Sequence, residues 1–313
     1  VPLFNEEENV SLLIDQIIGS LEKLDYQWEV ILVDDGSTDN SLEKTLEEIS
    51  KHSAKFKVIE MQRNFGQTSA MQAGIDHSSG EIIVTIDGDL QNDPQDIPRL
   101  VKRFINEDLD LLVGRRKKRR DNFLLRTLPS IIANQLIGSV TGVKLHDYGC
   151  SLKVYKASII KNVRLYGEMH RFIPAWVATV TNPQKIAEEI VTHHPRKHGK
   201  SKYGLSRTFR IILDLLVVFF FMRFRGKPGH FFGAIGLVLG FLGTVSLSYL
   251  GIIKFYFGED IGSRPLLFIG ILLILSSIQL LTTGIITELI ARTYFEASNS
   301  KAYMIRKIYE FDG

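Results

Sequence analysis

Two long stretches without Asp, Glu, Lys or Arg limit most strongly what this chain can fold into. They cover residues 231–253 and 265–287, and residues 254–264 connect them. As a helix, each stretch is long enough to cross the roughly 30 Å hydrocarbon core of a membrane. A pair of buried helices in a soluble core is the alternative, but the short connection disfavours it. We therefore predict two transmembrane helices within residues 229–291.

Basic residues flank this region unevenly. The segment before it and the residues after 291 contain Arg223, Arg225, Lys227, Arg292, Lys301, Arg306 and Lys307. In the connection, Lys254 and Arg264 are balanced by Glu259 and Asp260. Cytoplasmic loops are enriched in Lys and Arg, so we expect the N-terminal part and the tail, residues 292–313, to be cytoplasmic.

Two further segments are predicted to lie on the membrane surface. Residues 206–228 have an apolar centre that is too short to span, with basic residues at both ends. Residues 122–140 mix apolar residues with Arg126 and follow the basic run "RRKKRR" at 115–120. Amphipathic helices on anionic membranes have this composition. For the basic run alone, a solvated loop is an equally good interpretation.

Residues 1–205 are predicted to form a separate domain, whose first part alternates strand-like and helix-like patterns. Strands are expected at 29–37, 57–61, 81–89 and 110–115, and helices near 6–24, 41–53, 68–78 and 94–107. Runs of Val, Ile and Leu separated by helices indicate an α/β fold, with a mainly parallel sheet covered on both faces. The 45% hydrophobic content excludes a disordered chain, and a net charge of +3 gives no reason to expect nucleic acid as a partner.

Three polar clusters follow strand-like segments of this domain. They are "NEEEN" at 5–9, "DDGSTD" at 34–39 and "DGDLQ" at 87–91. Because ligands of such sheets bind beyond the carboxyl ends of the strands, the clusters can converge on one crevice. No G-x-G-x-x-G follows the first strand, and no G-x-x-x-x-G-K-[ST] occurs. Phosphates must therefore be held in another way.

The acids of the third cluster predict a metal site. Asp87, Asp89 and Asp93 repel one another, so a positively charged partner is expected nearby. Mg²⁺ and Mn²⁺ take hard oxygen ligands and share them with substrate phosphates. We favour Asp89 and the amide oxygen of Gln91 as ligands, with Asp87 facing a nucleoside. An ordinary Asp-rich turn is the alternative.

At this point the sequence resembles the family 2 glycosyltransferases, which have a GT-A fold. The matching segments, in family order, are "VPLFNEEENV", "VDDGSTDNS", "RNFGQTSAMQAGIDHSSG" and "DGDLQNDP". Three further segments, "DYGCSLKVY", "HRFIPAW" and "RKHGKSKYG", resemble those of polyprenyl-phosphate sugar transferases. These include the bactoprenol glucosyltransferases and the dolichol-phosphate mannose synthases. This resemblance covers roughly residues 1–210. The two C-terminal spans resemble the bactoprenol branch, which implies an integral protein of the bacterial inner membrane.

The resemblance implies an inverting transfer of a hexose, glucose from UDP-glucose, to undecaprenyl phosphate. It places Asp89 and Gln91 on Mg²⁺ or Mn²⁺. The nucleotide-sugar would be held by Pro2, Phe4, Glu6, Asp35 and Asp87. Arg116, Arg126 and Ser130 match family positions that contact the acceptor phosphate. Arg196, Ser201 and Lys202 match a loop that closes over the phosphates. Arg115 departs from the serine that relatives commonly have before the arginine.

Asp147 is the catalytic base that the resemblance implies. A phosphate acceptor is already ionised near neutral pH, because its second pKa is about 6, so proton abstraction is not required. Orientation of the sugar or acceptor is one alternative role, and a turn before Gly149 is another. His193 and His194 end a strand-like segment, and we expect structural roles for both.

Other functions remain open at this level. A GDP-mannose-dependent polyprenyl-phosphate mannosyltransferase would use the same residues. A processive polysaccharide synthase is disfavoured, because neither Trp28 nor Trp176 sits in a Gln-x-x-Arg-Trp motif. A membrane scaffold or lipid-handling protein with an inactive domain is the third candidate.

Two further expectations concern association and the start of the chain. The spacing of Gly236 and Gly240 favours close helix packing, either in a homo-oligomer or within one chain. The sequence opens as if at the end of a strand, so we expect a few apolar residues to precede Val1.

Overall fold

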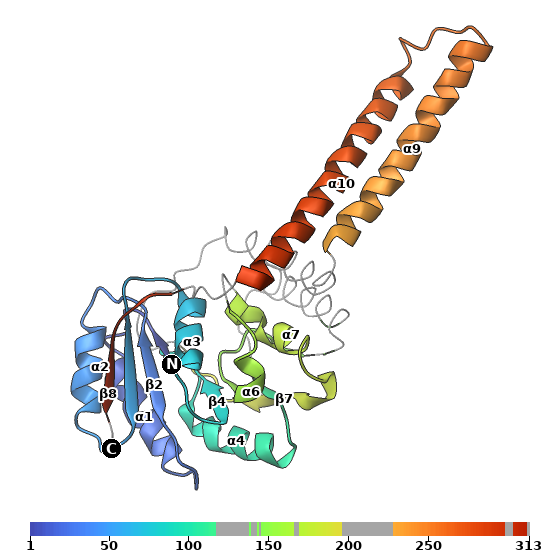
Figure 1. The fold of residues 1–313 in the computed structure, drawn as a ribbon. Coiled ribbons are helices and arrows are strands. Elements are labelled where there is room, and N and C mark those ends of the chain that lie inside the picture. The colour runs from blue at the N-terminus through green and yellow to red at the C-terminus, as the bar shows by residue number, and fades with distance from the viewer. Residues whose placement is uncertain are drawn as a thin grey trace. The chain divides into compact units, whose positions relative to one another are not determined.

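The computed structural model describes residues 1–116, 138, 143, 145–165, 169–195, 228–297 and 303–311 (Figure 1). The chain forms two units. The first contains Val1–Phe219 with Lys301–Gly313, and the second Phe220–Ser300. Apart from residues 138 and 228, the two predicted surface segments at 122–140 and 206–228 lie outside the described residues.

The first unit contains two mixed sheets in place of the one mainly parallel sheet expected, and they confirm the predicted α/β class. One has the order β1-β2-β3-β8, with β1 (Pro2–Leu3), β2 (Val30–Asp34), β3 (Phe56–Met61) and β8 (Ile305–Phe311). The other has the order β4-β6-β5-β7, with β4 (Ile82–Thr85), β6 (Lys153–Lys156), β5 (Leu111–Arg116) and β7 (Ile186–Val191). Strands β1, β2 and β3 are parallel, as are β5 and β7, whereas β6 and β8 run antiparallel to their neighbours.

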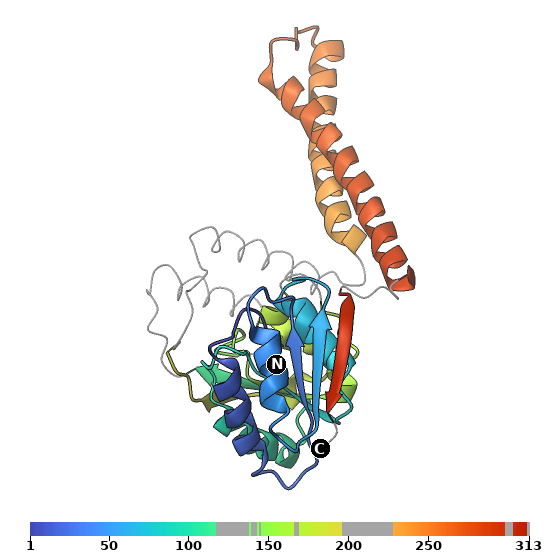
Figure 2. The same cartoon turned by 90° about the vertical axis from the view of Figure 1, so that its left-hand side faces the viewer.

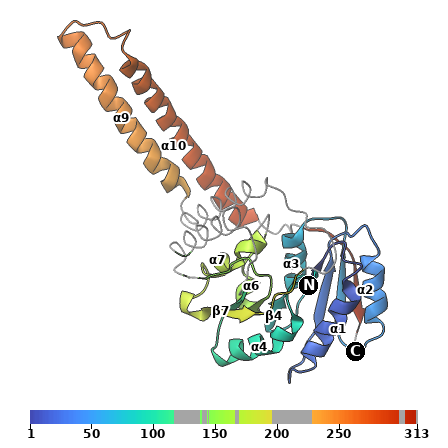
Figure 3. The same ribbon diagram turned by 180° about the vertical axis from the view of Figure 1, so that it is seen from behind.

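The predicted helices between these strands are present, with ends that differ by a few residues. They are α1 (Val10–Leu21), α2 (Ser41–Ile49), α3 (Gln67–Asp76) and α4 (Ile97–Asn106), the last preceded by the 3₁₀ turn η1 (Pro94–Asp96). Short helical turns follow at α6 (Ala157–Ile160), η3 (Met169–Phe172), α7 (Ile173–Val177) and η4 (Pro183–Lys185). Figure 3 shows α1, α3 and α4 beside the strands from the reverse side.

Alternation along the strands divides the core between the two faces of the first sheet. Leu32 of β2 and Val58 of β3 pack into a cluster with the α1 residue Leu13. Their neighbours Val33 and Ile59 belong to a second cluster with residues of α3. Successive side chains of a strand point to opposite faces. Helices α1 and α3 therefore cover opposite faces, as a doubly covered sheet requires.

Strand β8 comes from the segment that the sequence analysis treated only as a tail. Its residues pair antiparallel with β3, for example Ile308 with Ile59 and Lys307 with Glu60. Figure 2 shows this strand at the edge of the sheet beside β3. Its alternation of apolar and charged residues is short, and its partner lies far away in sequence, so local pattern did not reveal it.

The second unit is a helical hairpin of α9 (Pro228–Tyr256) and α10 (Pro265–Ala297). Within it, Phe232–Tyr256 (25 residues) and Pro265–Thr287 (23 residues) are long and apolar enough to cross a membrane. Large apolar side chains such as Leu237, Phe241 and Leu272 are exposed along them. Such an unburied apolar surface is typical of helices whose solvent is lipid.

Glycines of α9 face α10. A Cβ added at Gly240 would lie 2.7 Å from the Ser277 Oγ, and one added at Gly243 would lie 3.0 Å from the Ile274 side chain. A Cβ at Gly236 would meet Leu281 at 3.1 Å. These glycines thus pack the hairpin within one chain, the second of the two roles considered for them. Homo-oligomer formation stays a prediction.

A cavity of about 740 Å³ lies between β2 and β4. Apolar residues of both strands line it, including Val30, Ile31, Ile82 and Val84, together with Val1. The predicted acidic residues do not line it. Pro2, a predicted nucleotide contact, also lines it, as do Thr85 and Ile86, which precede Asp87.

Candidate active site

The loops after β1 and β2 are bonded to each other. The backbone amide of Asn5 donates to the Ser37 Oγ at 3.0 Å, and the Thr38 amide donates to the Asn5 Oδ1 at 2.8 Å. The Glu6 amide donates to the Ser41 Oγ at 2.7 Å. The first two polar clusters therefore converge as expected. Of the predicted nucleotide contacts, Pro2 lies in β1, and Phe4 and Glu6 follow it on this shared edge.

Asp35 holds a third loop to this edge. Its carboxylate accepts hydrogen bonds from the backbone amides of Phe65 (2.7 Å) and Gly66 (2.9 Å), just before α3. Asp35 is almost fully buried, and burial raises the pKa of its carboxyl group. The structure thus gives Asp35 a loop-fixing role that the sequence analysis did not foresee, beside its predicted contact with the nucleotide.

Gly36 is required by the same contact. It has a φ of +66°, and an added Cβ would lie 2.4 Å from the Arg63 carbonyl carbon. We expect Gly36→Ala to lower the free energy of unfolding by at least about 2 kcal/mol, because a left-handed strain is added to a backbone clash. Thermal unfolding and the KM for the donor measure the effect.

A matched control for this substitution is available in α1. Gly19 has no heavy atom within 4 Å of an added Cβ. Gly19→Ala is expected to stabilise the protein by about 0.5–1 kcal/mol through helix propensity. Equal unfolding midpoints for the two alanine variants would refute the steric account of Gly36.

The metal-motif loop follows β4. Asp87 is partly buried and accepts a hydrogen bond from the Gln67 Nε2 at 2.7 Å. Burial and the neighbouring Asp89 raise the pKa of the Asp87 carboxyl group. Asp89 is buried, and its Oδ1 accepts a hydrogen bond from the backbone amide of Gln91 at 3.2 Å. Leu90, with a φ of 57°, turns the chain sharply between the two predicted ligands.

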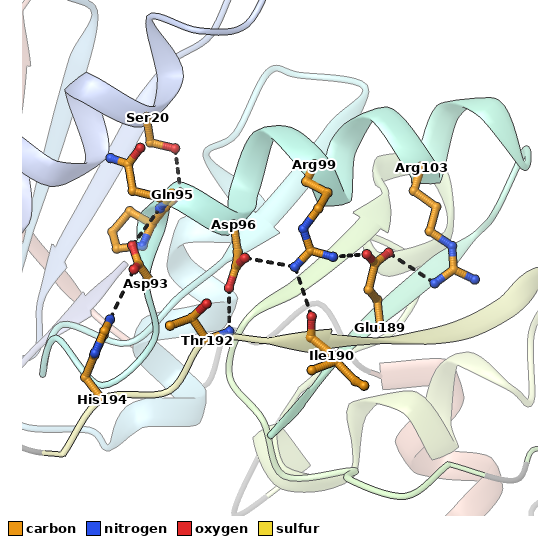
Figure 4. Close-up of polar contacts among 11 residues, drawn as sticks. Ser20, Asp93, Gln95, Asp96, Arg99, Arg103, Glu189, Ile190, Thr192 and His194 are labelled. Carbon is orange, nitrogen blue, oxygen red and sulfur yellow. Dashed lines mark hydrogen bonds and ion pairs between the residues drawn. The ribbon is translucent and has the colours of Figure 1, made fainter. Parts of the chain in front are cut away.

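The end of β7 anchors this loop, and Figure 4 shows part of the anchor. The His194 amide donates to the Gln91 carbonyl oxygen at 2.8 Å, and its Nε2 lies 3.1 Å from the Asp93 Oδ2. His193 forms a β-bridge with Asn92. Both histidines thus have the structural contacts that were expected of them, and they fix the shape of the metal-motif loop.

Helix α4 fixes β7 in turn (Figure 4). The Thr192 amide donates to the Asp96 Oδ2 at 2.6 Å, and the Arg99 Nη2 donates to the Asp96 Oδ1 at 2.8 Å. Arg99 and Arg103 both contact Glu189 of β7. Several partly buried ion pairs in one network hold an element more firmly than isolated surface pairs do.

Arg116, at the end of β5, forms a bidentate ion pair with Asp147. The Arg116 Nε donates to the Asp147 Oδ2 at 2.6 Å, and the Nη2 donates to the Oδ1 at 2.8 Å. The side chains are 19% and 7% exposed, respectively. The predicted acceptor-phosphate arginine and the predicted catalytic base are therefore direct partners, which the sequence analysis did not anticipate.

Lys153 is a buried charge close to Asp87 and Asp147 that the sequence analysis did not single out. It lies in β6, is almost fully buried, and donates from Nζ to the Cys150 carbonyl oxygen. Burial lowers the pKa of its ammonium group, while the charges of Asp87 and Asp147 act in the opposite direction. A lysine inside the otherwise apolar strand "LKVY" was the available signal.

The donor set fits a divalent ion. The predicted ligands Asp89 and Gln91 lie in one loop and offer a carboxylate and an amide oxygen, and hard oxygens are what Mg²⁺ and Mn²⁺ bind. Burial and the negative charge of Asp89 raise the pKa of the Asp87 carboxyl group, while the charges of Lys153 and Arg116 act in the opposite direction. Among the described residues, Asp15, Glu48 and His52 also lie close together, with the His52 Nε2 3.5 Å from Asp15 and 3.8 Å from Glu48.

Five predicted phosphate-binding residues lie outside the described part of the chain. They are Arg126, Ser130, Arg196, Ser201 and Lys202. Their roles stay predictions.

Comparison with known proteins identifies the class to which this site belongs. The family model described as "Glycosyl transferase family 2" matches residues 1–164. This chain belongs to that family, and it is a glycosyltransferase.

Two curated relatives match almost the whole chain. A protein of Rhizobium johnstonii named dodecaprenyl-phosphate galacturonate synthase is 56% identical over 99% of this chain and 92% of its own. An undecaprenyl-phosphate 4-deoxy-4-formamido-L-arabinose transferase of Photorhabdus laumondii is 31% identical over 98% of this chain and 92% of its own. Both names describe sugar transfer to a polyprenyl phosphate.

Solved structures support the GT-A fold. Glucosyl-3-phosphoglycerate synthase from Mycobacterium tuberculosis, in complex with Mn²⁺ and uridine-diphosphate-glucose, matches with a TM-score of 0.53. The identity is 18%, and the match covers 70% of this chain and 76% of that one. At this identity the likeness shows the fold alone.

Proposed function

We propose that this protein transfers a sugar from a nucleotide-sugar to a polyprenyl phosphate at the cytoplasmic face of a bacterial inner membrane. The observation that carries the proposal is the meeting of Asp87, Asp89, Asp147 and Arg116 beyond the ends of β4 and β5, in a chain that also has two helices long enough to span a membrane. The names of the two relatives support the acceptor class.

Galacturonate is the sugar that we propose first. The resemblance of the motifs predicted glucose from UDP-glucose, and that prediction stays open. The relative that is 56% identical over nearly the whole chain carries a galacturonate name, whereas those named for formamido-arabinose are near 31%. Higher identity along the full length favours the galacturonate donor, with glucose and mannose as alternatives.

The chemistry is a displacement at the anomeric carbon. An oxygen of the acceptor phosphate forms a bond to that carbon, and the bond from the carbon to the β-phosphate oxygen breaks. The leaving nucleoside diphosphate keeps the electron pair. When bound at Asp89 and Gln91, a divalent ion supplies positive charge for the diphosphate. The acceptor phosphate is ionised near pH 7, so no proton has to be removed by Asp147.

Arg116 is assigned to the acceptor. Its planar guanidinium group can donate to two phosphate oxygens at once. Asp35 and the loops after β1 and β2 hold the nucleotide edge in place through the bonds described above. Asp87 is assigned to the nucleoside side.

Chain topology supports a cytoplasmic active site. Strand β8 follows the hairpin in sequence and pairs with β3 of the first unit. A hairpin that crosses the membrane twice returns the chain to the side from which it left. Together with the basic flanks, this supports the proposal that the catalytic unit and the tail lie on the cytoplasmic side.

The donor and the metal are tested together. We expect purified protein with undecaprenyl phosphate and Mg²⁺ or Mn²⁺ to form labelled lipid from UDP-galacturonate faster than from UDP-glucose or GDP-mannose. EDTA is expected to stop the reaction, and added Mn²⁺ to restore it. Faster transfer from UDP-glucose would keep the reaction and change the sugar. If folded protein labels no lipid from any donor, the scaffold hypothesis takes its place.

A further inference from the structure

The pairing of Arg116 with Asp147 raises a conflict within the proposed function. Both guanidinium bonds go to one carboxylate at 2.6 and 2.8 Å. An arginine neutralised in this way attracts a second anion weakly, and the low exposure of the pair strengthens this effect. The acceptor phosphate and Asp147 therefore compete for the same positive charge.

Resting on the proposed function, we propose that Asp147 is an internal ligand of Arg116 that the acceptor phosphate replaces. Asp147 then determines which acceptors bind. A phosphate monoester carries up to two negative charges and several acceptor oxygens, so it can displace a carboxylate group. A neutral lipid alcohol cannot displace it. The pair thus selects a terminal phosphate over other lipid headgroups.

The surroundings of Asp147 allow such an exchange. Its Oδ1 also accepts from the Gly149 amide at 3.2 Å, a bond that can remain after Arg116 leaves. The Lys153 ammonium group, buried in β6, interacts electrostatically with Asp147 and Asp87. A displaced Asp147 therefore keeps a backbone donor and a nearby positive charge. This spares it the high cost of a buried carboxylate without a partner.

Two roles of Asp147 predict opposite effects of Asp147→Asn: displacement from Arg116 by the acceptor phosphate, and permanent orientation of Arg116. If Asp147 is displaced, the neutral amide competes less for Arg116, and the acceptor binds more tightly. We expect the Kd for farnesyl phosphate to fall about tenfold, because one hydrogen bond to a charged group has that effect. If Asp147 instead holds Arg116 in its binding orientation, the substitution weakens binding. Arg116→Lys is expected to weaken acceptor binding in either case.

Glu107→Gln provides the matched control. Glu107 also pairs with an arginine, Arg103, at 2.9 Å, but just after the end of α4, where the Glu107 side chain is 47% exposed and Arg103 keeps its contact with Glu189. The substitution removes the same charge, so it reports any general effect on the attraction of anions to the protein.

The experiment measures farnesyl phosphate binding to the full chain in phosphatidylcholine nanodiscs, and acceptor KM and kcat wherever a variant turns over. A lower Kd in Asp147→Asn, with Glu107→Gln unchanged, supports the exchange. An unchanged or higher Kd in Asp147→Asn, or equal decreases in both variants, overturns it. Direct binding keeps the test valid if Asp147→Asn loses activity. Failure of the wild-type protein to label lipid from any donor counts against the proposed function instead.

Discussion

Asp89→Asn is expected to reduce sugar transfer at least about 100-fold. The substitution keeps the size of the side chain but removes the charged oxygen proposed to hold the divalent ion. Such an ion contributes several kcal/mol of charge stabilisation in a transition state, and each 1.4 kcal/mol corresponds to roughly tenfold in rate. Asp89 is buried and its charge repels that of Asp87, so the neutral replacement removes this repulsion, and thermal unfolding of the variant checks its fold.

Two quantities are measured for each variant: the rate of sugar transfer, and the affinity for Mn²⁺ as monitored by electron paramagnetic resonance. Asp93→Asn is the matched control, since it removes one charge from the same loop while its side-chain oxygen can still accept from the Gln95 backbone amide (2.9 Å), and the backbone bond from His194 to Gln91 still anchors the loop. We expect Asp93→Asn to retain Mn²⁺ binding and most activity. Normal Mn²⁺ affinity in Asp89→Asn would show that the metal is held elsewhere.

Deletion of residues 301–313 is expected to lower the free energy of unfolding of the catalytic unit by at least about 3 kcal/mol. The deletion removes buried Tyr303 and the partly buried residues Ile305, Tyr309 and Phe311 from the core. A fully buried large apolar side chain contributes about 1.5–3 kcal/mol, and whole domains have only about 5–15 kcal/mol in total. Loss of the last strand also exposes the edge of β3 to pairing with other chains.

A polar contact adds to this cost. Glu60 in β3 is buried and accepts from the Arg306 Nη1 at 2.9 Å and from the Tyr309 hydroxyl at 3.1 Å. Without β8 its carboxylate loses both donors, and a buried charge without partners is costly. Thermal unfolding and aggregation of the full-length and shortened proteins in nanodiscs measure the effect. Met304→Ser, at an exposed position beside β8, serves as control. An unchanged midpoint after deletion would mean that β8 is dispensable.

Much of the first unit could be predicted from sequence because the pattern that forms it is local. The apolar runs at 29–37 and 57–61 became β2 and β3, and the helix-like stretch near 68–78 became α3. The strand β8 could not be predicted in this way. Its pairing with β3 joins residues almost the whole chain apart, and its own pattern is short and charged.

The meeting of the first two polar clusters was also predictable, because β1 and β2 are parallel neighbours and their carboxyl ends lie at one edge, whereas the third cluster follows β4 of the other sheet. What each acid does there was not predictable. Both carboxylate oxygens of Asp35 accept hydrogen bonds from backbone amides just before α3, and both of Asp147 accept from the Arg116 guanidinium group. Partners of a carboxylate group depend on which loops meet in space.

The sequence by itself thus determined the family, the α/β class, the two apolar helices and the acids of the metal motif, because composition, period and motif are properties of neighbouring residues. Only the tertiary structure decided that the C-terminal segment completes the first sheet, that Lys153 is buried beside the acids, and that Arg116 and Asp147 are paired. These depend on contacts between distant segments, and burial sets the strength of the charges that meet there.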